Sequence, residues 1–247
     1  MPEIAYYRFE GPDGILGNVV DTSGHSRHHG TIQMGAPTFS RNIRVAQIPQ
    51  TGTTNRSSMK FGARDAVRFG FPFPFQTERE ATLELWAYPT RKAESAFIWT
   101  AIALNSGDSN RFNIGCHGDG AAFIEYREPD GTLHPLTAPD SSVVIPANDW
   151  SYIAFVKRDD EYSIYVNNRT TGNATLLASQ VRDGDLTDPA GRKPNLPNSK
   201  GWTINGRIIM QPKDGFQFTG LLDEIRLSDK ALSPAEFLVA EKSGDRE

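Results

Sequence analysis

Short stretches in which apolar and polar residues alternate recur along the chain, separated by clusters of Gly, Pro, Asn and Asp. They are rich in β-branched and aromatic residues, which is typical of β-strands. The stretches predicted as strands are IAYYRF (4–9), ATLELWAY (81–88), AFIWTAIAL (96–104), RFNIGC (111–116), AAFIEYRE (121–128), WSYIAFVK (150–157) and YSIYVNN (162–168). Their spacing predicts an all-β chain built as a sandwich of antiparallel sheets.

One segment near the C-terminus has the pattern of a helix, LSPAEFLVAEK (232–242). Ser233 is suited to the N-cap, Pro234 to the first helical position, and Glu236 completes a capping box. We therefore expect a short C-terminal helix.

The segment FQFTGLLDEIRL (216–227) is a further predicted strand with a change of phase. Phe216 and Phe218 have the opposite parity to the residues that follow, which are Leu221, Asp223, Ile225 and Leu227. If both apolar sets face the core, the register slips, and Gly220 is the expected position of the bulge. Asp223 would then lie among apolar neighbours, where a carboxylate needs a cation or hydrogen-bond donors.

Length and composition restrict the class of protein. A 247-residue all-β chain is expected to form one domain over residues 1–247. The net charge of -4 and the absence of a Lys/Arg cluster argue against a nucleic-acid partner. The single cysteine, Cys116, excludes an intrachain disulfide. No apolar run is long enough for membrane insertion, and no signal peptide is present, so the chain is either intracellular or a mature or excised domain.

The stretch DTSGHSRHHG (21–30) holds three histidines and is a candidate metal loop. The spacing of His25, His28 and His29 would bring their rings together only on a helix, and flanking glycines argue against a helix here. Zinc is therefore the weaker hypothesis, and ordinary loop histidines are the alternative.

Several segments, in this order, resemble one known family: AYYRFEG, VVDTSGHSRHHGTI, SMKFGARDAVRF, EATLELWAYP, NDWSYIAFVKRDDEYSIYVNN, TINGR and FTGLLDEIRLSDKALSPAEF. They are similar to the LamG-like jelly-roll domains of the concanavalin A-like lectin/glucanase superfamily, and they span about residues 5 to 240. The resemblance implies a jelly-roll β-sandwich of two antiparallel sheets, one of them concave, with ligand sites on the concave face or its rim loops.

The resemblance also implies a structural calcium ion, Ca²⁺, held by Asp21 and Asp223 with help from loop carbonyls. Calcium prefers oxygen ligands of this kind. The alternative is that Asp21 makes a local turn with Ser23 and Gly24, while Asp223 pairs with an Arg or His.

No catalytic pattern is evident. A retaining glucanase needs two carboxylates about 5–5.5 Å apart on one face. Glu80 and Glu84 are four residues apart with Thr82 between them, and alternation places Asp223 and Glu224 on opposite faces. No serine-hydrolase or phosphate-binding motif is present.

Binding chemistry is the remaining function. Sugar sites combine an aromatic ring with polar groups that reach the hydroxyls. The candidate ligand contacts are Trp99, Tyr126, Arg127 and Trp202, each of which could instead be core or ordinary surface.

We therefore predict a non-catalytic carbohydrate-binding or adhesion module with a structural calcium, excised from a larger exported bacterial protein. Its location would be extracellular, cell-surface or periplasmic, and its partner a glycan or polysaccharide. The alternatives are a polysaccharide-active enzyme of the same fold, and a protein-interaction or architectural domain.

Overall fold

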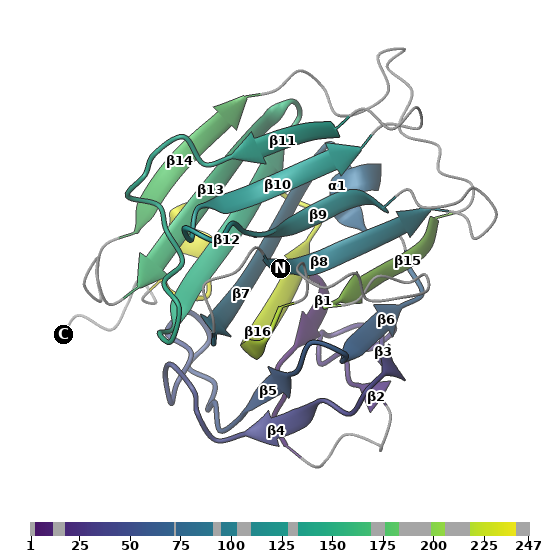
Figure 1. Ribbon diagram of the computed structural model, residues 1–247. Coiled ribbons are helices and arrows are strands. Elements are labelled where there is room, and N and C mark those ends of the chain that lie inside the picture. Colours follow the sequence, from purple (N-terminus) through teal and green to yellow (C-terminus); the bar gives the residue numbers. More distant parts are fainter. Residues whose placement is uncertain are drawn as a thin grey trace.

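A computed structural model describes residues 3–11, 18–71, 73–90, 95–102, 110–127, 133–168, 176–182, 199–205 and 218–240. Within these residues the chain forms two sheets that lie over each other as two layers (Figure 1). Every strand pair described is antiparallel, which confirms the predicted sandwich. In the described part of the chain, no helix has the length and apolar character needed to cross a membrane.

The first layer, sheet A, has the order β14-β13-β12-β7-β16-β5-β4, and β1 also pairs with β16. Its strands are β1 (Glu3–Tyr7), β4 (Thr38–Ser40), β5 (Ser58–Phe61), β7 (Glu80–Pro89), β12 (Ser151–Arg158), β13 (Glu161–Asn168), β14 (Leu177–Arg182) and β16 (Gly220–Ser228). β16 lies in the middle of the layer, although it is the last strand in the sequence. The final strand is therefore held on both sides by earlier strands.

The second layer, sheet B, has the order β11-β10-β9-β8-β15-β6-β3-β2 and lies in front of sheet A in Figure 1. Its strands are β2 (Asn18–Val19), β3 (Gly30–Met34), β6 (Ala66–Phe69), β8 (Ser95–Ile102), β9 (Asn110–Cys116), β10 (Ala122–Arg127), β11 (Leu133–Thr137) and β15 (Ser199–Ile204). Both sheets therefore interleave strands from distant parts of the sequence, as expected for a jelly roll.

The main hydrophobic core lies between the two sheets and follows from strand alternation. Leu83 of β7 is paired with Phe155 of β12 in sheet A, and both side chains are fully buried. Ile114 of β9 is paired with Ile124 of β10 in sheet B, and these belong to the same cluster. Because successive residues of a strand point to opposite faces, the residues between them point to the outer faces.

A second apolar cluster covers the outer face of sheet A. Trp86 and Tyr152 are directly paired across β7 and β12, and Leu232, Phe237 and Leu238 from the C-terminal segment pack on them. The central strands of sheet A are therefore buried on both faces.

The predicted C-terminal helix is reduced to one 3-10 turn, Pro234–Glu236. The capping box is present, and Glu236 accepts hydrogen bonds from the backbone and hydroxyl of Ser233. At Phe237 the backbone becomes extended, and Phe237 and Leu238 are buried against sheet A. We infer that burial of these two side chains outweighs continuation of the helix.

The bulge in β16 occurs later than predicted. The pairing with β7 shifts between Asp223 and Arg226, and Glu224 has a φ of 48°. On the other side of β16, β5 pairs only as far as Leu222 and β1 begins at Ile225. The bulge therefore lies where the neighbouring strand changes. As a result Leu221 belongs to the outer cluster of sheet A, and not to the inter-sheet core with Ile225.

Candidate functional site

Asp21 lies at the start of the loop that follows β2, and its carboxylate is surrounded by backbone amides. Oδ1 accepts hydrogen bonds from the N–H groups of Tyr6 at 3.0 Å and Ser23 at 2.9 Å. Oδ2 accepts from the N–H groups of Arg27 at 3.1 Å and His28 at 3.0 Å. The buried Asp21 therefore acts as the anchor around which the loop folds.

The electrostatics of Asp21 agree with this role. Burial raises the pKa of its carboxyl, but the backbone donors of Tyr6, Ser23 and His28 outweigh burial and hold the pKa below its usual value. Hydrogen bonds to the charged form have this effect.

The histidines of the same loop have separate roles. The Nδ1 atom of His29 accepts a hydrogen bond from the backbone N–H of Asp21 at 3.0 Å. The ring of His28 packs on Phe71 with centroids 4.0 Å apart, and His25 is exposed. Among the residues that the structure describes, no three His, Cys, Asp or Glu side chains form a group that could hold a metal ion.

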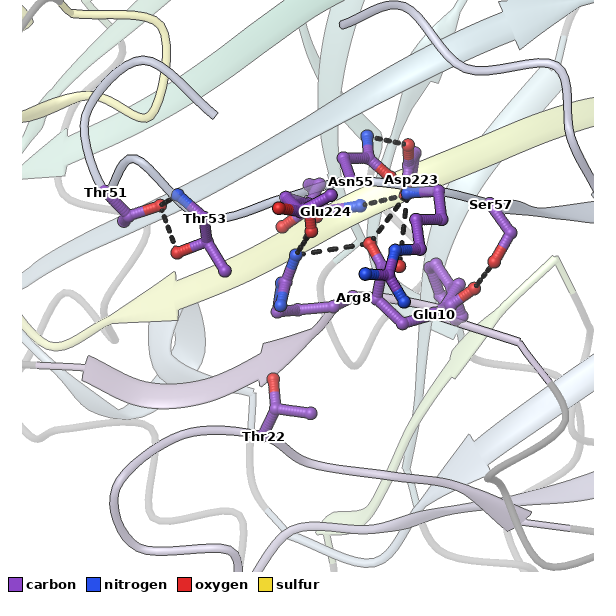
Figure 2. A network of polar contacts seen from close by, with 12 residues as sticks. Arg8, Glu10, Thr22, Thr51, Thr53, Asn55, Ser57, Asp223 and Glu224 are labelled. Carbon is purple, nitrogen blue, oxygen red and sulfur yellow. Dashed lines mark hydrogen bonds and ion pairs between the residues drawn. The ribbon is translucent and has the colours of Figure 1, made fainter. Parts of the chain in front are cut away.

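A polar network fills the place where β16 changes its neighbour from β5 to β1 (Figure 2). Asn55, just before β5, donates from Nδ2 to Asp223 Oδ2 at 2.8 Å. Arg8, just after β1, donates from Nε to Glu224 Oε1 at 3.3 Å, and the hydroxyl of Tyr6 donates to Glu224 Oε2. At the bulge itself the backbone N–H of Glu224 donates to Asp223 Oδ1 at 2.9 Å, so a side chain replaces the missing strand partner of this donor.

Arg8 also joins this network to the loop that crosses the outer face of sheet A before β5. Its Nη2 atom donates to the carbonyl of Thr54 at 2.6 Å and to Glu10 at 3.1 Å. Glu10 in turn accepts from the backbone N–H of Arg56. The loop residues 54–56 are therefore tied to β1 and β16 at several points.

The two carboxyl groups at the bulge are poorly suited to carry full charge. Burial raises the pKa of Glu224 to about 7, against the lowering effects of Tyr6 and Arg8. Burial, together with the neighbouring Glu224, raises the pKa of Asp223 well above its usual value. Both groups are almost completely buried, so ionisation has a desolvation cost.

The calcium site expected from the resemblance does not fit these contacts. A calcium ion needs six to eight oxygen ligands with free lone pairs. Both oxygens of Asp21 instead face backbone N–H donors, and Asp223 is bonded to Asn55 and to the backbone N–H of Glu224 at 2.9 Å. The two aspartates share no hydrogen-bond partner among the described residues. These contacts argue against calcium at Asp21 and Asp223, and the turn expected as the alternative for Asp21 is present.

Trp202 was a candidate ligand contact, and the structure places it in the core. Its side chain is fully buried and belongs to the inter-sheet cluster. The indole stacks on Phe69 with ring centroids 4.1 Å apart and an interplanar angle of 17°. A ring enclosed in this way offers no face to a ligand, so the predicted sugar contact at Trp202 is corrected to core packing.

The other three candidate ligand residues lie on strands of sheet B, and their side chains fall outside the described part of the structure. The backbone of Trp99 in β8 pairs with Asn113 of β9. In β10, Tyr126 pairs with Phe112, and Arg127 pairs with Leu133 of β11. The ligand role of Trp99, Tyr126 and Arg127 stays a prediction.

A row of positions, most of them polar, crosses the outer face of sheet B. Asn113 is paired with Glu125, and both alternate with the core residues Ile114 and Ile124. Following the register across the sheet, the row contains Thr31, Arg68, Thr203, Trp99, Asn113, Glu125 and Pro135.

The Asn113–Glu125 pair is the best-defined part of this row. Asn113 Nδ2 donates to Glu125 Oε2 at 3.1 Å, and both residues are partly exposed, although the Asn113 Oδ1 atom is buried. Neither residue was among the predicted ligand contacts, and the two are 12 positions apart in the sequence. The cross-strand register brings them together.

The two-layer antiparallel sandwich, with its last strand in the middle of one sheet, defines a protein of the concanavalin A-like class. The Laminin_G_3 family model, described as the concanavalin A-like lectin/glucanases superfamily, matches residues 61–237. The chain belongs to this family. No curated protein sequence matches the chain.

Solved structures with the same fold include Domain 4 of AbnA, a GH43 extracellular arabinanase from Geobacillus stearothermophilus, in complex with arabinotriose. It is 16% identical, with a TM-score of 0.54, and the match covers 95% of each chain. The binding domain of botulinum neurotoxin serotype D/C VPI 5993 is 12% identical with a TM-score of 0.58, over 94% of this chain and 50% of that chain.

A mutant of Trypanosoma rangeli sialidase displaying trans-sialidase activity is also 12% identical. Its TM-score is 0.57, and the match covers 97% of this chain and 32% of that chain. At these identities the three similarities establish the fold alone.

Proposed function

We propose that the chain is a non-catalytic carbohydrate-binding module that takes a glycan on the outer face of sheet B. The observation that carries the proposal is the polar row on this face, with Asn113 and Glu125 hydrogen-bonded to each other and partly exposed. The Glu125 carboxylate can accept hydrogen bonds from sugar hydroxyls, and Asn113 holds it in place through Nδ2, while Asn113 Oδ1 is buried.

The similarity to the arabinanase domain supports this proposal, because that domain was solved with arabinotriose and the match extends over nearly all of both chains. The same arabinanase is extracellular. We extend this to the present chain, as an adhesion or carbohydrate-binding unit of a larger exported bacterial protein, with an extracellular, cell-surface or periplasmic location.

The buried acids support a non-catalytic role. Glu84, Asp223 and Glu224 are almost completely buried in sheet A, in contact with other protein groups. Glu125 on sheet B is directly paired with Asn113 and Pro135, neither of which is an acid. A retaining hydrolase instead needs two carboxylates about 5–5.5 Å apart that a substrate can reach.

The proposal is tested by titration calorimetry with arabinotriose, after a glycan array has surveyed other neutral glycans. We expect Asn113→Ala and Glu125→Gln each to weaken binding about tenfold, as for loss of a hydrogen bond to a charged or well-placed group. Gln180→Ala, an exposed change on β14 of sheet A, is the control and should bind as the unaltered chain does.

Three outcomes would contradict the proposal. A silent array and silent calorimetry would exclude glycan binding and favour a protein-interaction or architectural role. Equal binding by all the variants would place the site away from Asn113 and Glu125. Release of reducing ends or unsaturated products from a polysaccharide panel would identify an enzyme.

A further inference from the structure

A pocket of about 130 Å³ opens at one end of the sandwich, and neither Asn113 nor Glu125 lines it. Three segments line it: Pro89 at the end of β7, residues 116–120 in the turn between β9 and β10, and residues 144–147. One wall therefore comes from sheet A and another from sheet B, at the rim where the two layers meet.

The turn that forms one wall is held rigidly. The backbone N–H of Gly120 donates to the His117 carbonyl at 2.9 Å, and the N–H of Ile145 donates to the Gly120 carbonyl at 2.8 Å. Gly120 has a φ of +94°, and a Cβ at this position would lie 2.8 Å from the Ile145 carbonyl oxygen. The pocket is therefore formed before any ligand enters, which reduces the entropy lost on binding.

The walls combine apolar and polar groups in the manner of a small-ligand site. Pro89, Val144, Pro146 and Ala147 provide apolar surface. Asp119 lines the pocket and is exposed; its Oδ1 accepts the N–H of Ala121 at 2.9 Å, while Oδ2 accepts no hydrogen bond from the described residues. Such pockets bind ligands that have both an apolar face and hydroxyl groups.

The imidazole of His117 is fixed at the same pocket. Its Nε2 atom is 3.0 Å from Thr137 Oγ1, and its ring packs on Phe123 with centroids 4.6 Å apart. The neighbouring thiol is unsuited to chemistry, because burial raises the pKa of Cys116 to about 12. The pocket is therefore suited to binding and lacks an activated nucleophile at Cys116.

Charge narrows the class of ligand. The acid Asp119 lies at the pocket, none of the lining residues is Lys or Arg, and the chain has a net charge of -4. An anionic sugar would be repelled, whereas a carboxylate oxygen can accept hydrogen bonds from the hydroxyls of a neutral sugar.

The pocket also lies within reach of the proposed glycan face. The turn leads directly into β10, on which Glu125 lies four residues beyond Ala121, or roughly 13 Å at about 3.4 Å per residue. An oligosaccharide that contacts Asn113 and Glu125 could therefore extend along β10 toward this rim.

We propose that the rim pocket is a second subsite that binds the terminal residue of a neutral glycan through the carboxylate of Asp119. This proposal rests on the proposed glycan-binding function, and deepens it by selecting neutral over acidic sugars.

The test is a titration of the ¹⁵N-labelled chain followed by amide chemical shifts, with arabinotriose, D-galactose and N-acetylneuraminic acid as separate probes. We expect a neutral probe to shift the amides of residues 117–120 and 145, and the acidic sugar to leave them unchanged. Asp119→Asn should weaken the response of these amides about tenfold.

Asp140→Asn is the matched control. Asp140 is also exposed and also accepts the N–H two residues later through Oδ1, at 2.8 Å, but it does not line the pocket. A second variant, Ala147→Phe, fills the pocket while leaving the turn sequence intact, and it should abolish the same shifts. The melting temperatures of all three variants are measured so that a folding defect is recognised.

The outcomes separate the two proposals. Shifts confined to residues around Asn113 and Glu125 would overturn the rim subsite and leave the proposed function intact. No shift with any probe would overturn the subsite, and a silent glycan array would then remove the proposed function as well. Stronger pocket shifts with N-acetylneuraminic acid than with D-galactose would overturn the selection of neutral sugars.

Discussion

The outer faces of the two sheets differ in how far other parts of the chain cover them. The outer face of sheet A carries Trp86 and Tyr152 and is covered by Ile48 and the C-terminal residues Phe237 and Leu238. On the outer face of sheet B, Arg68, Asn113 and Glu125 are partly exposed, whereas Thr203 and Phe123 are buried. Strand alternation is the same in both sheets, so the difference lies in what covers each face.

Covering sheet A requires that its polar groups be satisfied from within the protein. Glu84 accepts hydrogen bonds from the Tyr152 hydroxyl at 2.6 Å, the Leu238 N–H at 2.7 Å and Arg226 Nε at 2.6 Å. The buried charged groups of sheet A are therefore held by other protein groups. The partly exposed groups of sheet B can hydrogen-bond to water or to a ligand, which is the physical basis for expecting stability from one face and binding from the other.

The largest effect on this contrast is expected from Glu84→Ala. The change leaves Arg226 buried without its carboxylate partner, and the Tyr152 hydroxyl and Leu238 N–H without an acceptor. We expect a loss of about 3–5 kcal/mol in the free energy of unfolding, measured by urea denaturation, with glycan affinity unchanged at a temperature where the chain is folded.

Glu80→Ala on the same strand is the control for this prediction, because Glu80 is exposed. It should change the free energy of unfolding by less than about 1 kcal/mol. A cost below about 1 kcal/mol for Glu84→Ala as well would remove the assignment of sheet A as the stabilising face.

An effect of intermediate size is expected in the pH dependence of the free energy of unfolding. The pKa of Glu224 is raised by burial from its ordinary value of 4.5 to about 7, so the native state holds this proton more tightly than the unfolded chain does. The stabilisation is complete below about pH 4.5 and is lost as the pH rises toward about 7. It amounts to at most about 3 kcal/mol.

Glu224→Gln removes this ionisation, so the decline in the free energy of unfolding between about pH 5 and 8 should become shallower. Part of the decline should persist, because burial raises the pKa of Asp223 in the same direction. Denaturation curves at several pH values measure the slope, and Glu80→Gln should leave it unchanged. Identical slopes for Glu224→Gln and the unaltered chain would contradict the role given to Glu224.

The smallest effect is expected from calcium. A bound ion at one hundred times its dissociation constant would add about 2.7 kcal/mol, which corresponds to a rise of roughly 5–10 °C in melting temperature for a chain of this size. Because the carboxylates of Asp21 and Asp223 already have protein donors, we expect calcium chloride and EDTA to change the melting temperature by less than about 1 °C. A calcium-dependent rise that Asp223→Ala abolishes would restore the predicted calcium site.

The antiparallel sandwich and its family could be predicted from the sequence, because strand alternation and turn residues are local signals. Individual core positions were harder to predict from the sequence. Trp202 has an aromatic ring of the kind that contacts sugars. Only the pairing of β15 with β6 places this ring on Phe69. The bulge was predicted at Gly220, whereas the exchange of β5 for β1 beside β16 moves it to Asp223 and Glu224.

The candidate site could be predicted only in part from the sequence. Asn113 and Glu125 are twelve residues apart, and nothing local indicates that they form a hydrogen-bonded pair. The rim pocket is lined by Pro89 and by residues 116–120 and 144–147. These three segments share no sequence motif that would predict a pocket.

The sequence by itself indicated strands such as β7, β12 and β13, because the period of two in apolar residues is set by the geometry of the extended chain. Strands such as β4, β11 and β14 were not predicted from it. For Asp21 the sequence left two alternatives open, a calcium ligand and a local turn, and the structure contains the turn. The tertiary structure alone decided which face of each sheet is covered, where the strand register shifts and which polar side chains meet. These features depend on contacts between residues far apart in the chain, such as Tyr6 and Glu224, and local patterns carry no information about them.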